Sequence, residues 1–181
     1  MKMNVPNALT ILRMCMVPVF VLIMLTGVGG SYSDIIAGII FVAASLTDTL
    51  DGHIARKYNQ ITVFGKFMDP LADKLLVCSA LICLVELERI SAAIVIVIIG
   101  RDFIISGFRL VAAEKGVVIA ANIWGKVKTA VQMVTITLLV FNFGGVFDVI
   151  DPILVWAALI LTVVSLVVYL WQNRGVLEEV H

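Results

Sequence analysis

The segment SLTDTLDGHIARKYNQITVFGKFMDPLADK, residues 45–74, holds four aspartates together with Arg56, Lys57, Lys66 and Lys74. The 181-residue chain around it is 61% hydrophobic and only 14% charged. Soluble domains are about 45–50% apolar and about 25% charged. The chain therefore gathers its carboxylates and cations where two apolar segments meet, and this concentration of charge indicates a functional site.

The composition as a whole predicts an integral membrane protein. The mean hydropathy is +1.10, and an apolar excess of this size does not fit inside so small a globule. The formal net charge is zero, so the overall charge indicates neither a nucleic acid nor an acidic partner. The length suits one compact bundle, and we expect a single domain over residues 1–181.

Six apolar segments are long enough to cross the hydrocarbon core, which takes about 20 residues per helix. The predicted spans lie near residues 8–27, 34–57, 62–86, 90–114, 125–143 and 150–172. Asn7 is expected to cap the first span, and the glycine-rich TGVGG is expected to stop it. The predicted fold is an all-α integral membrane protein with six transmembrane helices.

Lys and Arg are distributed unevenly between the predicted loops. The first, third and fifth loops carry only Arg89, while the opposite side receives most of the other cations. Cytoplasmic loops of membrane proteins are enriched in Lys and Arg. We therefore predict that both termini and residues 45–74 face the cytoplasm.

The three cysteines lie among apolar residues and form no CxxC or Cys/His motif. This context is typical of buried thiols that act as small hydrophobic side chains. We expect Cys15, Cys78 and Cys83 all to be buried.

The four aspartates are spaced so that they can converge. Asp48 and Asp51 are three residues apart and Asp69 and Asp73 are four apart, so each pair shares one helix face. Brought together by a short turn, four carboxylates would repel unless cations neutralised them. Oxygen ligands without His or Cys favour Mg²⁺ or Mn²⁺ over zinc. The alternative is a set of solvated carboxylates at helix ends, paired with Arg56, Lys66 and Lys74.

Two glycines accompany these aspartates. Gly52 lies one turn after Asp48, and Gly65 lies one turn before Asp69. Glycine costs a helix about 1 kcal/mol relative to alanine, and its missing side chain would leave room for a ligand's base or sugar. Close packing between helices is the alternative explanation.

The segment fits the pattern D-x-x-D-G-x-x-A-R-x8-G-x-x-x-D-x-x-x-D, and every fixed position is filled. The chain thereby resembles the CDP-alcohol phosphatidyltransferase family, whose members are membrane enzymes of six helices. The segment VPNALTILRM resembles the opening helix of bacterial members. The segments RDFIISGFRL and GKVKT resemble the branch that makes phosphatidylglycerol phosphate. The resemblance implies transfer of a phosphatidyl group from CDP-diacylglycerol to glycerol 3-phosphate, with release of CMP.

The resemblance also implies roles for individual residues. Asp48, Asp51, Asp69 and Asp73 would hold two divalent metal ions, Mg²⁺ or Mn²⁺, and Asp73 would also act as the general base. A homodimer is implied as well. The residues expected to bind CDP-diacylglycerol are Gly52, Ala55, Arg56, Gly65, Lys66, Thr10 and Arg13.

The first span adds a polar stripe, because Asn7, Thr10 and Arg13 are spaced three residues apart. This stripe could face the phosphates of the nucleotide. Alternatively, Asn7 caps the helix and Thr10 bonds its own backbone. His53 occupies a variable position of the pattern and is not expected to be a ligand.

Glycerol 3-phosphate is a small dianion, so its pocket requires cations. The candidates to bind it are Arg101, Arg109, Lys126 and Lys128, in the fourth and fifth predicted spans. The alternative is that these side chains extend to the membrane surface and only set the orientation. Arg101 also adjoins Asp102 and could simply form an ion pair within the membrane.

Two other functions fit parts of the pattern. The same chemistry could use another acceptor, namely serine, inositol phosphate or phosphatidylglycerol. The aspartates could instead form the translocation site of a small ion-coupled transporter. A transporter would carry polar residues toward the far side of the membrane, whereas the far halves of these spans are almost wholly apolar.

Overall fold

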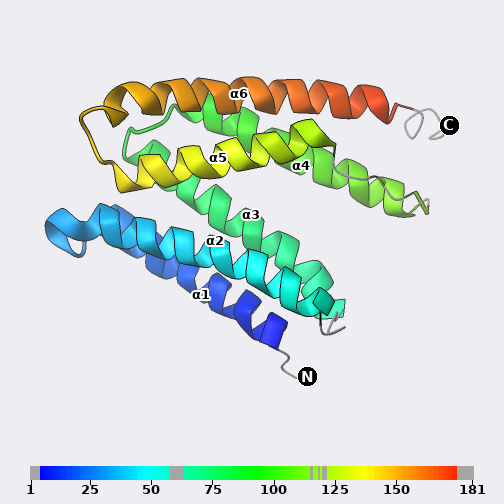
Figure 1. The fold of residues 1–181 in the computed structure, drawn as a ribbon, viewed down its shortest axis with the longest axis horizontal. Helices are drawn as coiled ribbons and strands as arrows, with labels where there is room; N and C mark the ends of the chain where they lie inside the picture. Colours follow the sequence, from blue (N-terminus) through cyan, green and yellow to red (C-terminus); the bar gives the residue numbers. More distant parts are fainter. Residues whose placement is uncertain (1–4, 58–62, 115, 118, 120–121, 175–181) are drawn as a thin grey trace. The chain divides into compact units, whose positions relative to one another are not determined.

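The computed structural model describes the backbone of residues 5–57, 63–114, 116–117, 119 and 122–174, and their side chains except at 5–6, 48–57 and 63–67. These residues form six long helices and a short 3₁₀ helix, and the described ranges contain no strand (Figure 1). The six-helix, all-α prediction is confirmed. The elements are α1 (Val5–Thr26), η1 (Gly30–Tyr32), α2 (Ser33–Lys57), α3 (Val63–Glu86), α4 (Ala92–Glu114), α5 (Ile123–Phe141) and α6 (Phe147–Gln172).

Two predictions concern the ends of α1, namely that Asn7 caps its start and that glycine stops it. Because α1 begins at Val5, Asn7 lies inside the helix and is 2% exposed, so the prediction that it caps α1 is wrong. The glycine stop is confirmed. Gly27 follows the last residue, Thr26, with φ of 65°, and its N–H donates to the carbonyl of Ile23. This left-handed conformation favours glycine, which has no Cβ.

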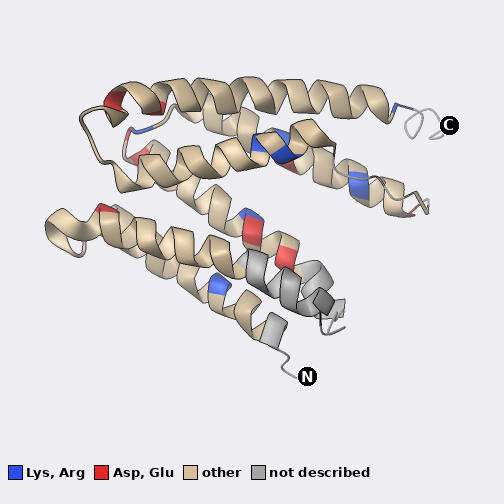
Figure 2. Ribbon diagram, viewed as in Figure 1, with Lys and Arg blue, Asp and Glu red and all other residues tan. Residues whose placement is uncertain are grey.

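Four stretches of the described chain are long and apolar enough to cross a membrane, namely Asn7–Thr26, Gly30–Thr47, Ile123–Phe141 and Phe147–Gln172. Helices α3 and α4 carry more charged residues along their length. Elsewhere the described helices are mostly uncharged (Figure 2). Large apolar side chains also lie on the surface, as expected for helices that face lipid.

The cysteines do not share one environment. Cys83 is buried, Cys78 is partly exposed and Cys15 is exposed. The prediction of burial is therefore wrong for Cys15, which lies on the outward face of α1 with the exposed side chains of Leu12 and Val19.

Contacts divide the chain into two compact units. The first comprises Met1–Arg89 with Leu139–Asn142, and the second comprises Ile90–Leu138 with Phe143–His181. In the first unit α1 packs along both α2 and α3. Phe20 of α1 and Phe41 of α2 are fully buried, with ring centroids 5.9 Å apart.

The end of α5 also packs tightly into the first unit. A Cβ added to Gly38 of α2 would lie 2.6 Å from the ring of Phe141. Since real Cβ atoms do not approach that closely, glycine is what allows the ring to rest on α2.

Arg89 connects three parts of the first unit. Its Nη2 donates to Oδ2 of Asp34 at 2.7 Å, and its Nη1 donates to the carbonyls of Leu139 and Val140 at 3.1 and 3.2 Å. The side-chain amide of Asn142 donates to the same Asp34 oxygen at 3.2 Å. The start of α2, the link after α3 and the end of α5 thus meet at one end of this unit, as expected for odd-numbered loops on one side of a membrane.

The second unit buries polar side chains between apolar helices. Helix α4 packs against α6, where Phe108 and Tyr169 make an edge-to-face contact with centroids 5.8 Å apart. The hydroxyl of Thr135 in α5 donates to the carbonyl of Val131 at 2.8 Å and also lies 3.4 Å from the carbonyl of Leu154 in α6. The buried polar and charged residues of this unit are Arg101, Lys128, Gln132, Thr135, Thr162 and Ser165.

We expect Arg89→Ala to destabilise the protein by about 1–3 kcal/mol, because it leaves Asp34 and two carbonyls without their donor. Arg89→Lys should recover only part of the loss, since one ammonium cannot reproduce the planar fork. Thermal unfolding of the detergent-solubilised protein measures both effects. Arg174→Ala, which removes an exposed arginine, is the control. An equal midpoint for Arg89→Ala and this control would contradict the structural role of Arg89.

Candidate active site

The aspartate-bearing segment lies on two helices of the first unit. Asp48 and Asp51 are in the last turns of α2, where the backbone alone is described. Asp69 and Asp73 are in α3, one turn apart, with partly exposed side chains. The helical register of both pairs agrees with the sequence prediction.

The hydroxyl of Thr10 holds one of these carboxylates. Thr10 in α1 is fully buried, and its Oγ1 donates to Oδ1 of Asp69 at 2.6 Å. The hydroxyl of Thr10 thus reaches across from α1 to α3. A hydrogen bond to a charged oxygen restricts the rotation of the carboxylate, so Thr10 orients Asp69.

Arg13 places a buried cation beside α2. It is 0% exposed, and its Nε donates to the carbonyl of Ala44 at 3.1 Å. Ala44 lies one turn before Asp48, so Arg13 reaches the part of α2 that leads into the aspartates. A guanidinium has five N–H donors, which suits it to an anionic group.

The donor set fits a hard divalent cation. Asp69 and Asp73 offer carboxylate oxygens on one helix face, and Thr10 orients the first of them. Such oxygens are the ligands that Mg²⁺ and Mn²⁺ prefer. Among the side chains that the structure describes, no three acidic, His or Cys residues form a metal-binding group. The carboxylates of Asp48 and Asp51 lie outside that set.

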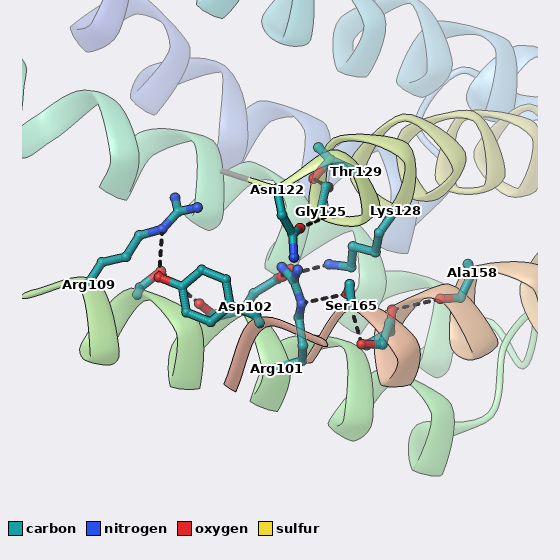
Figure 3. A network of polar contacts seen from close by, with 12 residues as sticks. Arg101, Asp102, Arg109, Asn122, Gly125, Lys128, Thr129, Ala158 and Ser165 are labelled. Atoms are coloured by element: carbon teal, nitrogen blue, oxygen red, sulfur yellow. Dashed lines mark hydrogen bonds and ion pairs between the residues drawn. The ribbon is translucent and has the colours of Figure 1, made fainter. Parts of the chain in front are cut away.

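A second cluster of charges lies inside the second unit (Figure 3). Oδ1 of Asp102 accepts from Nη1 of Arg101 at 3.0 Å and from Nζ of Lys128 at 2.6 Å. Nε of Arg101 donates to Oγ of Ser165 at 3.1 Å. Arg101 is 8% exposed and Lys128 is 1% exposed. The ion pair between Arg101 and Asp102, given above as the alternative to ligand binding by Arg101, is present, and Lys128 joins it.

The two other predicted cations are exposed. Arg109 of α4 donates from Nε to the hydroxyl of Tyr169 at 3.3 Å, and its guanidinium carbon lies 5.6 Å from the centre of that ring. Tyr169 itself is only 2% exposed. Lys126 lies in the first turn of α5. A buried aromatic side chain thus orients Arg109 at the surface.

The family profile described as CDP-alcohol phosphatidyltransferase matches residues 3–164. The chain belongs to the CDP-alcohol phosphatidyltransferase family. Family members generally depend on divalent metal ions. Together with the four long apolar stretches, membership identifies a multi-pass membrane protein.

Individual members of the family are similar over nearly the whole chain. A Bacillus subtilis protein named CDP-diacylglycerol–glycerol-3-phosphate 3-phosphatidyltransferase is 42% identical, covering 97% of each chain. The Haemophilus influenzae protein of that name is 39% identical over 99% of this chain and 98% of its own. A probable phosphatidylglycerophosphate synthase from Mycobacterium tuberculosis is 42% identical over 92% of this chain and 79% of its own.

Five of the residues expected to bind CDP-diacylglycerol lie outside the described side chains. They are Gly52, Ala55, Arg56, Gly65 and Lys66. Their roles in this phosphatidyltransferase therefore stay predictions. Tyr169, Ser165 and Asn122 were not predicted from the sequence. Asn122 precedes α5 and could have been found as a helix cap, whereas the other two lie in an apolar helix without any local signal.

We expect Thr10→Val to weaken divalent-metal binding by about tenfold or more, as loss of a group that orients a ligand typically does. Valine keeps the shape of threonine but cannot donate to Asp69. Titration of the purified protein with Mn²⁺, followed by electron paramagnetic resonance, measures the affinity without any turnover. Thr10→Ser retains the hydroxyl and serves as the matched control. Equal Mn²⁺ affinities for the valine and serine variants would refute the orienting role.

Proposed function

We propose that the protein transfers the phosphatidyl group of CDP-diacylglycerol to sn-glycerol 3-phosphate, forming phosphatidylglycerol phosphate and CMP. Three observations support this proposal. The aspartate motif is complete, the relatives that cover nearly all of the chain carry the name of this activity, and the second unit buries cations suited to a phosphate.

On the donor side, the motif residues and the start of α1 would bind CDP-diacylglycerol. Arg13 would contribute a buried positive charge toward the pyrophosphate, and Thr10 would keep Asp69 in one orientation. Arg56 and Lys66 would add charge, and small residues would leave room for the nucleotide. The small residues of this group are Gly52, Ala55 and Gly65.

Asp48, Asp51, Asp69 and Asp73 would hold two divalent ions, Mg²⁺ or Mn²⁺. When bound, these ions supply electrophilic activation of the pyrophosphate and charge neutralisation for the departing CMP. The chain's own carboxylate performs the proton transfer. Asp73 takes the proton of the acceptor hydroxyl while the hydroxyl oxygen of the acceptor forms a bond to the lipid-side phosphorus. The bond between that phosphorus and CMP breaks in the same step.

On the acceptor side, Arg101, Arg109, Lys126 and Lys128 would bind the phosphate of glycerol 3-phosphate. Charge-assisted hydrogen bonds to a phosphate are about twice as strong as neutral ones. Arg101 and Lys128 are held close together by Asp102, while Arg109 rests on Tyr169. Both arrangements reduce the entropy that the cations lose when they bind an anion.

The buried cations favour glycerol 3-phosphate over an acceptor without a phosphate, such as serine. Inositol phosphate and phosphatidylglycerol would use the same chemistry and stay as competing acceptors. Ion-coupled transport would proceed without CMP release. We further propose that the active site faces the cytoplasm, because the motif segment is rich in Lys and Arg, and that the enzyme is a homodimer.

We expect membranes containing the protein to convert labelled glycerol 3-phosphate and CDP-diacylglycerol into phosphatidylglycerol phosphate, and a chelator to abolish the reaction. Chromatography of the labelled lipid identifies the product. Serine, inositol phosphate and phosphatidylglycerol should give little product in parallel reactions. A preference for one of them would reassign the acceptor, and ion flux without CMP release would indicate a transporter.

Asp73→Asn should lower turnover by on the order of 10²–10⁴-fold, because an amide cannot accept the hydroxyl proton. Release of CMP measures turnover, and the amount of folded protein recovered from membranes controls for insertion. His53→Ala changes a variable position of the same motif and should retain activity. Near-normal turnover by Asp73→Asn would eliminate this residue as the base.

Arg109→Ala should raise the KM for glycerol 3-phosphate by about tenfold or more, the effect of losing one charge-assisted hydrogen bond. The KM for CDP-diacylglycerol should change little. Steady-state kinetics with each substrate varied in turn separates the two effects, with Arg174→Ala as the control for loss of a surface charge. Equal increases in both KM values would contradict the assignment of Arg109 to the acceptor.

A further inference from the structure

The polar group that points most clearly to an additional ligand contact is the side chain of Asn122, directly before α5. Its Oδ1 accepts a hydrogen bond from the backbone N–H of Gly125 at 2.8 Å. This is the bond by which an N-cap residue satisfies the third residue of a helix. Asn122 therefore caps α5, and the bond determines which way its amide group faces.

The other amide atom, Nδ2 of Asn122, is buried, and it makes no hydrogen bond among the residues that the structure describes. Exchanging the two amide atoms would set an N–H against the N–H of Gly125, so the cap requires the nitrogen to occupy the buried position. A buried donor without an acceptor is costly and rare in folded proteins, which indicates that an acceptor is supplied from elsewhere.

Figure 3 shows this amide directed toward the guanidinium of Arg101, which shares Asp102 with the ammonium of Lys128. The distances around Gly125 agree. A Cβ added to Gly125 would lie 3.1 Å from Oδ1 of Asn122 and 3.4 Å from Nη2 of Arg101, so both side chains border the space that the glycine leaves. Nη2 is also the guanidinium nitrogen that is not engaged with Asp102 or Ser165.

The groups around this space are donors. Arg101 and Lys128 carry positive charge, and the amide of Asn122 adds two N–H groups. Within the described part of the second unit, both cations bind the same oxygen of one carboxylate. The acceptor that suits two cations and an amide donor is an anionic oxygen, such as that of a phosphate.

We propose that Asn122 is an acceptor-binding residue, whose Nδ2 donates to the phosphate of glycerol 3-phosphate beside Arg101 and Lys128. The identity of this anion rests on the proposed function. The presence of an anion site that includes Asn122 rests on the geometry alone. Asn122 thus has two roles, since one amide atom caps α5 and the other contacts the ligand.

Two substitutions separate these roles. Asn122→Asp keeps an oxygen that caps α5 but replaces the donor with a negative charge beside Arg101. Asn122→Ser keeps a capping oxygen on a shorter side chain that does not reach the ligand. Gln172→Glu makes the same amide-to-carboxylate change at an exposed position of α6 and is the matched control.

Thermal unfolding of the purified protein in detergent, with and without glycerol 3-phosphate or inorganic phosphate, tests anion binding without turnover. Without anion, all three variants should unfold at or near the wild-type midpoint. The anion should stabilise the wild type and Gln172→Glu, while its affinity should fall at least about tenfold in Asn122→Ser and further in Asn122→Asp. In the kinetic assay the KM for glycerol 3-phosphate should rise in parallel, with an unchanged KM for CDP-diacylglycerol.

Wild-type anion affinity in both Asn122 variants, or absence of anion binding by the wild type, would overturn this inference. The same holds if both variants unfold at lower temperature and lose activity toward both substrates equally, since the residue would then act only as a cap. Failure of the proposed function has a different signature. The anion would still bind in an Asn122-dependent manner, but no phosphatidylglycerol phosphate would form.

Discussion

Burying a charge in an apolar environment is costly unless a partner satisfies it, and the charged side chains described between these helices are paired accordingly. Arg89 binds Asp34, Arg101 and Lys128 share Asp102, and the hydroxyl of Thr10 binds Asp69. Except for the neighbouring Arg101 and Asp102, the partners in these contacts are at least 26 residues apart in the sequence. The pairing of polar groups therefore both stabilises the apolar helices and determines which of them meet.

The same constraint links stability to function in this family member. Thr10 connects α1 to α3 and also orients a predicted metal ligand. Asp102 connects α4 to α5 and also holds two cations near each other. Because like charges repel, the two cations stay together only while the carboxylate is present. Binding elements of this kind are preorganised, so less free energy is spent on ordering them when a substrate arrives.

The two units of the chain carry different charged groups. The first unit carries the aspartate motif, and its glycine at position 38 allows the close approach of Phe141. In the second unit the buried Arg101 donates to Ser165, and the exposed Arg109 donates to Tyr169. In the proposed function the first group of residues would bind the donor and the second group the acceptor, which matches the opposite charges that metal ions and a phosphate require.

Much of this protein could be predicted from its sequence. The helix positions follow from apolar segments of membrane-spanning length. Helical periodicity puts the two aspartates of each pair on the same helix face, because it depends only on residues a few positions apart. The filled motif identified the family. The start of α1 was predicted less accurately. An asparagine that caps a helix cannot be distinguished by sequence alone from one that is buried inside it, and Asn7 is buried inside α1.

The sequence by itself determined the all-α membrane fold, the number of helices and the location of each aspartate pair on one helix. Only the tertiary structure decided that Thr10 donates a hydrogen bond to Asp69 and that Lys128 forms an ion pair with Asp102. It also decided that Arg89 binds Asp34 at one end of the first unit and that Cys15 is exposed. The physical reason is that the rotation of each helix about its own axis is set by packing against its neighbours. Which side chains meet across helices is therefore a property of the assembled bundle and not of any local segment.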